Sequence, residues 1–195
     1  TELWNGQHHA FFDRQALAID PENLHRFSGL WISRQDAWPE NLQWSGPLWC
    51  AGLKTWQALA KKGLWVHGSS ESLGENENPN LDILCDEKIH WALLTHDQSA
   101  DLRTDSKNSL VATYKLIEKT PSKNLLEDLS KHTFFFWNSG SQFQYALKHC
   151  PEIKNKHHAC GPGHSFDIIR GLLLQHQSYE ANKLQVVLEP KDLFV

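Results

Sequence analysis

The sequence contains no methionine, and it has no strong excess of charge of either sign. Its 19 basic and 23 acidic side chains leave a formal net charge of -4, so the chain lacks the basic field that nucleic acids and anionic membrane surfaces attract. We therefore expect no nucleic-acid partner and no membrane partner, and any anion site has to be local. Because residue 1 is not methionine either, we expect the chain to be a processed or excised piece of a longer protein.

Long apolar runs and paired cysteines are missing as well. No run approaches the length of a transmembrane helix, and no signal-peptide pattern opens the chain. The four cysteines are dispersed through a sequence of α/β pattern, which favours reduced thiols. These features predict a soluble, cytoplasmic protein.

One group of potential metal ligands lies close together in the sequence. It consists of Cys150, His157, His158, Cys160 and His164. The spacing of these residues fits no common zinc finger, and His158 and Cys160 fall within a predicted strand. We therefore expect no bound metal.

The most regular part of the chain is residues 133–169, where a strand, a turn and a helix occur twice. The apolar run 133–137 is typical of a buried parallel strand, and the small residues 138–141 after it favour a turn and a helix N-cap. The pattern returns with a strand at 158–160, a Gly-Pro-Gly turn and a second helix. Such turns place backbone N–H groups at the carboxyl ends of parallel strands, where anionic ligands bind in open α/β sheets.

Strands and helices alternate along most of the chain, which predicts βαβ units and parallel sheets. Two extended segments, 11–19 and 110–119, flank a block with its own strand–helix series. We therefore predict an α/β protein of two small parallel-sheet, flavodoxin-like domains, joined by a two-strand linker, with the ligand crevice between the domains. The predicted strands cover residues 30–32, 48–51, 64–67, 89–95, 110–119, 133–137, 158–160 and 184–188. The predicted limits are 10–19 for the first linker strand, 20–109 for the first domain, 110–119 for the second linker strand and 120–195 for the second domain, to which 1–9 could also belong.

The two predicted domains share an internal repeat. Residues 31–37 align with 137–143, and residues 52–55 align with 161–164, at nearly the same separation along the chain. Each half therefore has a strand–Ser–turn–helix unit, followed by a strand–Gly-x-x-(Thr or His)–helix unit. Two matched pairs in the same order indicate a duplicated architecture.

On these residues the chain resembles the uroporphyrinogen-III synthase family, whose members close the macrocycle in tetrapyrrole synthesis. In each of two domains, that family has a Thr-Ser turn and a Gly-x-x-Thr turn, each leading from a strand into a helix. The first half here has Ser33-Arg34 and Gly52-Leu53-Lys54-Thr55, and the second has Ser139-Gly140-Ser141 and Gly161-Pro162-Gly163-His164. Tyr114 matches a tyrosine in the family's returning linker strand, and the resemblance covers the chain from about Ala10 onward.

The resemblance implies a substrate, hydroxymethylbilane, whose acetate and propionate arms call for many hydrogen-bond donors. It implies cyclisation to uroporphyrinogen III with inversion of the last ring, and no metal or organic cofactor. Tyr114 is the implied catalytic residue, because a phenol is protonated at neutral pH and can assist departure of the substrate's hydroxyl. The implied substrate-binding residues are Ser33, Arg34, Lys54, Thr55, Asn138, Ser139, Gly140, Ser141, Gly161, His164 and Ser165. The implied protein partner is hydroxymethylbilane synthase, acting separately or as a fusion, and we expect the chain itself to be a monomer.

The chain departs from the family pattern in two ways. Ile32, Asn138 and His164 stand where the family has threonine, and no counterpart of the family's opening strand and helix precedes the first linker strand. A fragment, the downstream part of a fusion or a divergent member would each account for these departures.

The same residues also have simpler explanations. Ser33 and Ser139 can be plain N-caps, the Gly161 turn can be no more than a tight turn, and Tyr114 can be an ordinary side chain of a half-buried strand. The alternative function is therefore a non-catalytic two-domain module that binds a tetrapyrrole or another polyanionic ligand.

Overall fold

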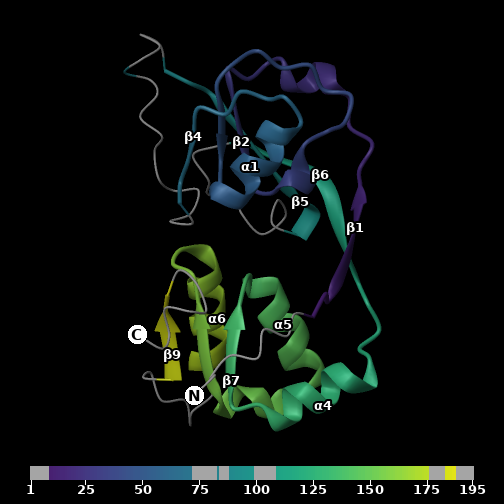
Figure 1. Cartoon of the computed structure of the whole chain (residues 1–195), viewed down its shortest axis with the longest axis vertical. Helices are drawn as coiled ribbons and strands as arrows, with labels where there is room; N and C mark the ends of the chain where they lie inside the picture. The colour runs from purple at the N-terminus through teal and green to yellow at the C-terminus, as the bar shows by residue number, and fades with distance from the viewer. Residues whose placement is uncertain (1–8, 72–82, 84–87, 99–108, 176–182, 188–195) are drawn as a thin grey trace. The chain divides into compact units, whose positions relative to one another are not determined.

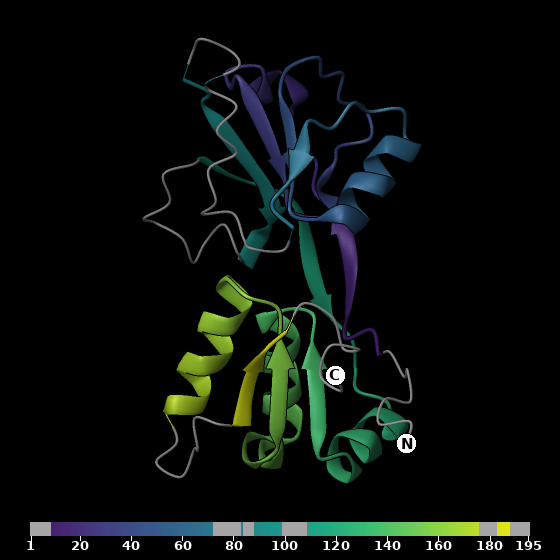
Figure 2. The same cartoon turned by 60° about the vertical axis from the view of Figure 1, so that its left-hand side comes forward.

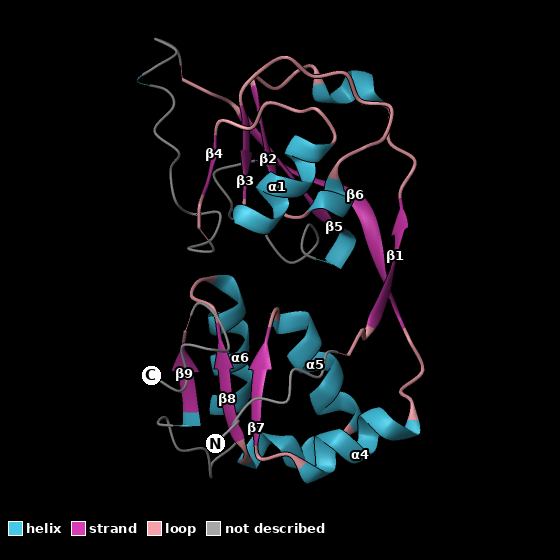
Figure 3. Ribbon diagram, viewed as in Figure 1, coloured by secondary structure: helices cyan, strands magenta, loops and turns pink. Residues whose placement is uncertain are grey.

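A computed structural model describes residues 9–71, 83, 88–98, 109–175 and 183–187 of the chain (Figure 1). The chain divides into two compact units. We call Asp13–Ile117 the central unit, and Thr1–Phe12 together with Glu118–Val195 the terminal unit. Each unit contains a sheet with parallel strands and flanking helices, so the predicted α/β class is confirmed (Figures 1 and 3).

The sheet of the central unit has six strands in the order β1-β6-β5-β2-β3-β4. Pairing is parallel between β2 and β3, β2 and β5, β3 and β4, and β5 and β6. The linker strands β1 and β6 run antiparallel, since Leu17 N donates to Thr113 O and Lys119 N donates to Phe11 O, each at 2.9 Å. The elements are β1 (Phe12–Ala16), η1 (Pro21–Leu24), β2 (Gly29–Ile32), η2 (Gln35–Ala37), β3 (Leu48–Cys50), α1 (Leu53–Lys61), β4 (Gly68–Ser69), β5 (Trp91–His96) and β6 (Ser109–Glu118).

Strand β2 lies at the centre of this sheet because both of its faces are apolar. Leu30 and Ile32 are fully buried in the main core, while Trp31, between them, is buried in a second cluster with Leu93 on the opposite face. Successive side chains of a strand point to opposite faces, and a parallel sheet covered on both sides needs apolar residues on each. The apolar run in the sequence therefore explains why β2 is an interior strand of the sheet.

The predicted strand at residues 64–67 is wrong, and the end of α1 explains why. Gly63, at a φ of +82°, takes the left-handed conformation expected of a residue just past a helix C-terminus. Gly63 N donates to Ala60 O and Leu64 N donates to Leu59 O, so Leu64 closes the helix instead of pairing with β3. Pairing with β3 begins only at His67, whose N–H donates to Leu48 O, and β4 is confined to Gly68–Ser69.

The terminal unit has a three-stranded parallel sheet in the order β7-β8-β9 (Figure 2). Its elements are α4 (Lys123–Lys131), β7 (Phe134–Trp137), α5 (Gly140–His149), η3 (Pro151–Asn155), β8 (His157–Cys160), α6 (His164–Leu174) and β9 (Leu184–Val186). The predicted strands 133–137 and 158–160 are confirmed, and the last residue of predicted strand 184–188 lies outside the described residues. Among the helices that the structure describes, none is both long and apolar enough to cross a membrane.

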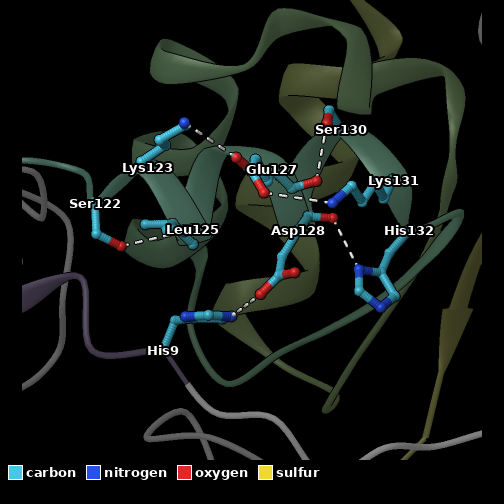
Figure 4. Close-up of polar contacts among 9 residues, drawn as sticks. All are labelled: His9, Ser122, Lys123, Leu125, Glu127, Asp128, Ser130, Lys131 and His132. Atoms are coloured by element: carbon cyan, nitrogen blue, oxygen red, sulfur yellow. Dashed lines mark hydrogen bonds and ion pairs between the residues drawn. The ribbon is translucent and has the colours of Figure 1, made fainter.

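Helix α4 is stabilised at its start and is tied to the segment before β1 (Figure 4). Ser122 is the N-cap, and its Oγ accepts a hydrogen bond from Leu125 N at 3.1 Å. His9 Nε2 lies 3.1 Å from Asp128 Oδ2, which links the chain ahead of β1 to the middle of the helix. The aromatic rings of Phe11 and Tyr145 stack at 5.3 Å between centroids, so the same segment also packs on α5.

Gly140, at the start of α5, is required for close packing of α5 against α6. A Cβ at this position would lie 2.9 Å from three side-chain atoms of Ile168, including its Cβ, which cannot move without its backbone. We expect Gly140→Ala to lower the free energy of unfolding by about 1–3 kcal/mol, the usual cost of overpacking. Urea unfolding of the purified chain measures this change.

Gly171, inside α6, provides the matched control. A Cβ there would meet nothing within 4 Å. Gly171→Ala should therefore raise the free energy of unfolding by about 0.5–1 kcal/mol, through helix propensity alone. Equal and small effects at both positions would contradict the close packing of the two helices.

Candidate functional site

The first set of predicted binding residues lies at one edge of the central sheet. Strands β2 and β3 are parallel and in register, with Ile32 opposite Cys50. Both strands therefore end at the same edge, and the Ser33 turn and the Gly52 turn follow directly from it. Ser33 N donates to Leu94 O at 3.1 Å, which fixes the first turn to β5 as well.

The Gly52 turn leaves the start of α1 open. Gly52 is the N-cap residue in an extended conformation, and no side chain of the described residues caps the helix. The first N–H groups of a helix have no partner within it and carry partial positive charge, so an anion is favoured there. Lys54 is exposed and Thr55 half-buried in this first turn, where the sequence predicted binding residues.

Tyr114 reaches the same edge from β6. Strands β5 and β6 are parallel with a register shift between Thr95 and His96, and the shift places His96 opposite Tyr114. Their ring centroids are 5.8 Å apart. Tyr114 is only 1% exposed and belongs to the main core of the unit.

Three charged residues influence the pKa of the Tyr114 phenol. Burial raises the pKa of Tyr114 above its ordinary value, while Arg34 and then Arg14 lower it and Asp36 raises it. Burial has the largest effect, so the phenol is protonated at neutral pH.

Ser33 is the second notable hydroxyl at this edge. Its Oγ is buried and makes no hydrogen bond of acceptable geometry with any described residue. The Ser33 hydroxyl nevertheless interacts with the Tyr114 phenol. This interaction lowers the pKa of the phenol, but by less than Arg34 and Arg14 do. A buried hydroxyl without a partner is costly, and the Tyr114 phenol is the neighbour that Ser33 has in the structure.

The two arginines are held by one carboxylate. Asp36 Oδ2 lies 3.4 Å from Arg14 Nε and 3.6 Å from Arg34 Nε. Asp36 belongs to the single turn η2, which Thr113 fixes through a 2.8 Å hydrogen bond from its Oγ1 to Ala37 O. The cluster therefore joins β1, the Ser33 turn and β6.

The second set of predicted binding residues lies at the equivalent edge of the terminal sheet. Strands β7 and β8 are parallel and in register, with Trp137 opposite Cys160, so the Asn138 turn and the Gly161 turn are neighbours. This arrangement repeats that of β2 and β3 in the central unit.

The Asn138 turn is occupied by its own capping interactions. Ser139 is the N-cap of α5, and its Oγ accepts from Gln142 N at 3.4 Å. The Gln142 side chain accepts from Asn138 N at 3.1 Å, in an arrangement close to a capping box. Ser141 is half-buried in the same first turn. Because Ser139 already accepts from Gln142 N, one of the first N–H groups of α5 has a partner.

The Gly161 turn, in contrast, leads into a helix without a side-chain cap. Gly163 is the N-cap of α6 at a φ of +88°, a conformation that favours glycine, and no side chain in the described ranges caps the helix. His164 is exposed and Ser165 half-buried in the first turn. The two Gly-x-x turns of the repeat therefore share one property, an uncapped helix start beside the carboxyl ends of parallel strands.

His158, one of the potential metal ligands, is instead a satisfied core residue. It is 0% exposed, its Nδ1 accepts from Trp137 Nε1 at 3.0 Å, and its Nε2 lies 2.9 Å from Ile153 O. Burial lowers the pKa of His158 to about 4, so the ring is neutral and donates from Nε2. Within the described ranges, no group of three His, Cys, Asp or Glu side chains is arranged to hold a metal ion.

The three cysteines that the structure describes are buried free thiols. Burial raises the pKa of Cys50, Cys150 and Cys160 to about 11. Cys85 lies outside the described residues. Thiols of this kind are poor nucleophiles near neutral pH, so none of the three is a candidate catalytic group.

Three residues near Tyr114 had no place in the sequence-based site: Arg14, Asp36 and His96. Asp36 lies in the same short turn as Arg34, and that proximity is the only sequence signal available. Arg14 reaches the cluster through the pairing of β1 with β6, and His96 through the pairing of β5 with β6. A single sequence does not reveal which strands pair.

No family model and no curated protein matches the chain. Among solved structures, the chain is similar to a mutant uroporphyrinogen III synthase from the extremely thermophilic bacterium Thermus thermophilus, with 10% identity, a TM-score of 0.46 and coverage of 92% of this chain and 82% of that one. It is also similar to a second structure of Thermus thermophilus uroporphyrinogen III synthase, with 11% identity, a TM-score of 0.36 and coverage of 81% and 76%. These likenesses are too distant to assign the chain to a family.

Proposed function

We propose that this chain is a cofactor-free lyase that cyclises hydroxymethylbilane to uroporphyrinogen III, with inversion of the last ring, in tetrapyrrole (heme) biosynthesis. The observation that carries the proposal is the duplicated arrangement at the sheet edges. In each unit, two adjacent parallel strands in register lead into a Ser turn and a Gly-x-x turn. These are the turns on which the sequence resembles the uroporphyrinogen-III synthase family.

The uncapped starts of α1 and α6 support binding of a polycarboxylate. Neither helix has a side-chain cap within the described residues, so the N–H groups at each helix start suit a carboxylate oxygen such as those of acetate and propionate arms. This supplies anion sites to a chain whose net charge is -4. Lys54 and His164, both exposed in these first turns, add further donors.

The protonated phenol of Tyr114 supports a role in loss of the hydroxyl. The phenol donates its proton to the hydroxyl as the C–O bond breaks, and water leaves. The electron pair of the adjacent pyrrole nitrogen stabilises the electron-poor methylene carbon that remains. The last ring then attacks through its substituted carbon and forms a spiro intermediate. The bond from that carbon to its original methylene bridge breaks, the methylene bonds to the free α-carbon of the same ring, and that carbon loses its proton, which replaces the proton lost by the phenol. Because the substrate supplies the electrons, the main task of the protein is to fold it so that the correct carbon attacks.

Freshly prepared hydroxymethylbilane tests the proposal. It closes spontaneously to the type I isomer, so an active chain is recognised by type III product in the isomer separation. Exclusive type I product, formed at the rate of the protein-free control, would contradict the proposal.

One observation favours the alternative, a non-catalytic module that binds a tetrapyrrole or another polyanion. Tyr114 is 1% exposed, and a catalytic phenol has to contact the substrate. A module of this kind would bind a porphyrin polycarboxylate and leave the isomer ratio at the spontaneous value. Measuring binding and isomer ratio on the same preparation separates the two functions.

A further inference from the structure

We propose that Arg14 and Arg34 together bind one carboxylate of the ligand, and that Asp36 positions the two guanidinium groups for it. The sequence-based site contains only Arg34. The identity of the ligand as a tetrapyrrole rests on the proposed function, while the paired arginines are an observation about the central unit alone.

The geometry holds the two arginines together without using up their donors. Both approach the same oxygen, Asp36 Oδ2, and do so through Nε at 3.4 and 3.6 Å. Charge-assisted hydrogen bonds between nitrogen and carboxylate oxygen measure about 2.7–2.9 Å. Neither guanidinium makes a hydrogen bond of normal geometry within the part of the chain that the structure describes.

The charges leave the cluster one positive charge in excess. Two guanidinium groups face a single carboxylate, and an arginine stays charged at any physiological pH. The three side chains are 33% (Arg14), 33% (Asp36) and 49% (Arg34) exposed, so solvent and a ligand can reach them. Asp36 keeps two like charges close together, which would otherwise repel each other.

The guanidinium group of an arginine suits a carboxylate better than the ammonium group of a lysine does. A guanidinium presents its N–H groups in a planar fork that matches the two oxygens of a carboxylate. A carboxylate bound here would lie near Tyr114, because Asp36 lies in the short turn η2, whose N-cap residue is Arg34, and Ala37 of that turn is in the same core cluster as Tyr114. The pair would thus place one acidic arm of the ligand next to the proton donor.

Equilibrium binding of uroporphyrin III, the stable oxidised form of the product with eight carboxylates, tests the inference in the full chain. We expect Arg14→Gln and Arg34→Gln each to weaken binding about tenfold, as for the loss of one charge-assisted hydrogen-bonding partner. Arg14→Lys, which keeps the charge and removes the fork, should weaken binding by a smaller factor. The matched control is Lys115→Gln, which removes one positive charge from the neighbour of Tyr114 on the opposite face of β6.

Binding of Lys115→Gln should stay within twofold of the unsubstituted chain, and a urea midpoint for each variant verifies that it is folded. If Arg14→Gln and Arg34→Gln bind no worse than Lys115→Gln, the arginine pair is an ordinary surface ion cluster and the inference is wrong. Failure of the unsubstituted chain to bind uroporphyrin III would also overturn it. The proposed function fails separately: a chain that makes no type III isomer, but loses porphyrin binding on either arginine substitution, retains the carboxylate site.

Discussion

Replacing Tyr114 by phenylalanine is expected to slow formation of the type III isomer by about 10²–10⁴-fold, the range in which a positioned general acid contributes. The substitution removes only the phenolic oxygen and keeps the ring that packs in the core beside His96. The change removes only the weak contact between the phenol and Ser33. The free energy of unfolding should therefore change by less than about 1 kcal/mol.

Tyr145→Phe is the matched control for that prediction. Tyr145 is also a buried tyrosine, but its hydroxyl donates to Lys119 O in the terminal unit. Removing this hydroxyl should lower the free energy of unfolding by about 1 kcal/mol and leave the isomer ratio unchanged. Type III formation at the original rate by Tyr114→Phe would remove Tyr114 from the mechanism, whatever the stability of the variant.

The second large effect is a pH-dependent loss of stability at His158. The folded state holds this ring neutral with a pKa of about 4, below the ordinary value of 6.5. As the pH falls below 6.5, the unfolded state binds the proton first, so stability is lost between pH 6.5 and 4 and is fully present above that window. Between about pH 7.5 and 4.5 the loss from this residue should amount to about 2 to 3 kcal/mol.

His158→Gln isolates this contribution. The glutamine cannot serve both Trp137 Nε1 and Ile153 O as the imidazole does, so at about pH 7.5 the variant should be less stable by about 1–3 kcal/mol. The difference between the two proteins should shrink as the pH falls, because only the unsubstituted chain carries the depressed pKa. His157→Gln, at the exposed neighbouring position of β8, keeps His158 and should therefore keep the loss of stability below pH 6.5. A stability difference that stays constant over the same pH range would contradict a neutral His158.

Local sequence patterns predicted the parts of the fold that depend on local chemistry. Strands β2, β3 and β7 are short apolar runs, and each ends at the small or polar residues that the turn requires. Gly63 ends α1, because glycine alone takes its positive φ without cost. The Ser and Gly-x-x turns are neighbours in each unit because parallel strands share a carboxyl edge.

The parts that could not be predicted depend on contacts between distant residues. Gly140 was a candidate binding residue in the sequence, and only the structure shows that Ile168 of α6 leaves no room for a side chain there. The sequence predicts no metal at His158, but only the structure shows that Trp137 and Ile153 satisfy both of its ring nitrogens. Arg14 joins Asp36 through tertiary structure, and no periodicity of the sequence indicates that pairing.

The isomer composition of the product from hydroxymethylbilane tests the central claim most directly. The substrate concentration is fixed, and a heat-denatured sample is the control. The fraction of type III uroporphyrinogen should rise with the concentration of the folded chain until the catalysed reaction is faster than spontaneous closure. The rise should need no added metal or cofactor and should be lost in Tyr114→Phe. Type I product alone at every protein concentration would show that the chain does not direct ring inversion, and would contradict the account.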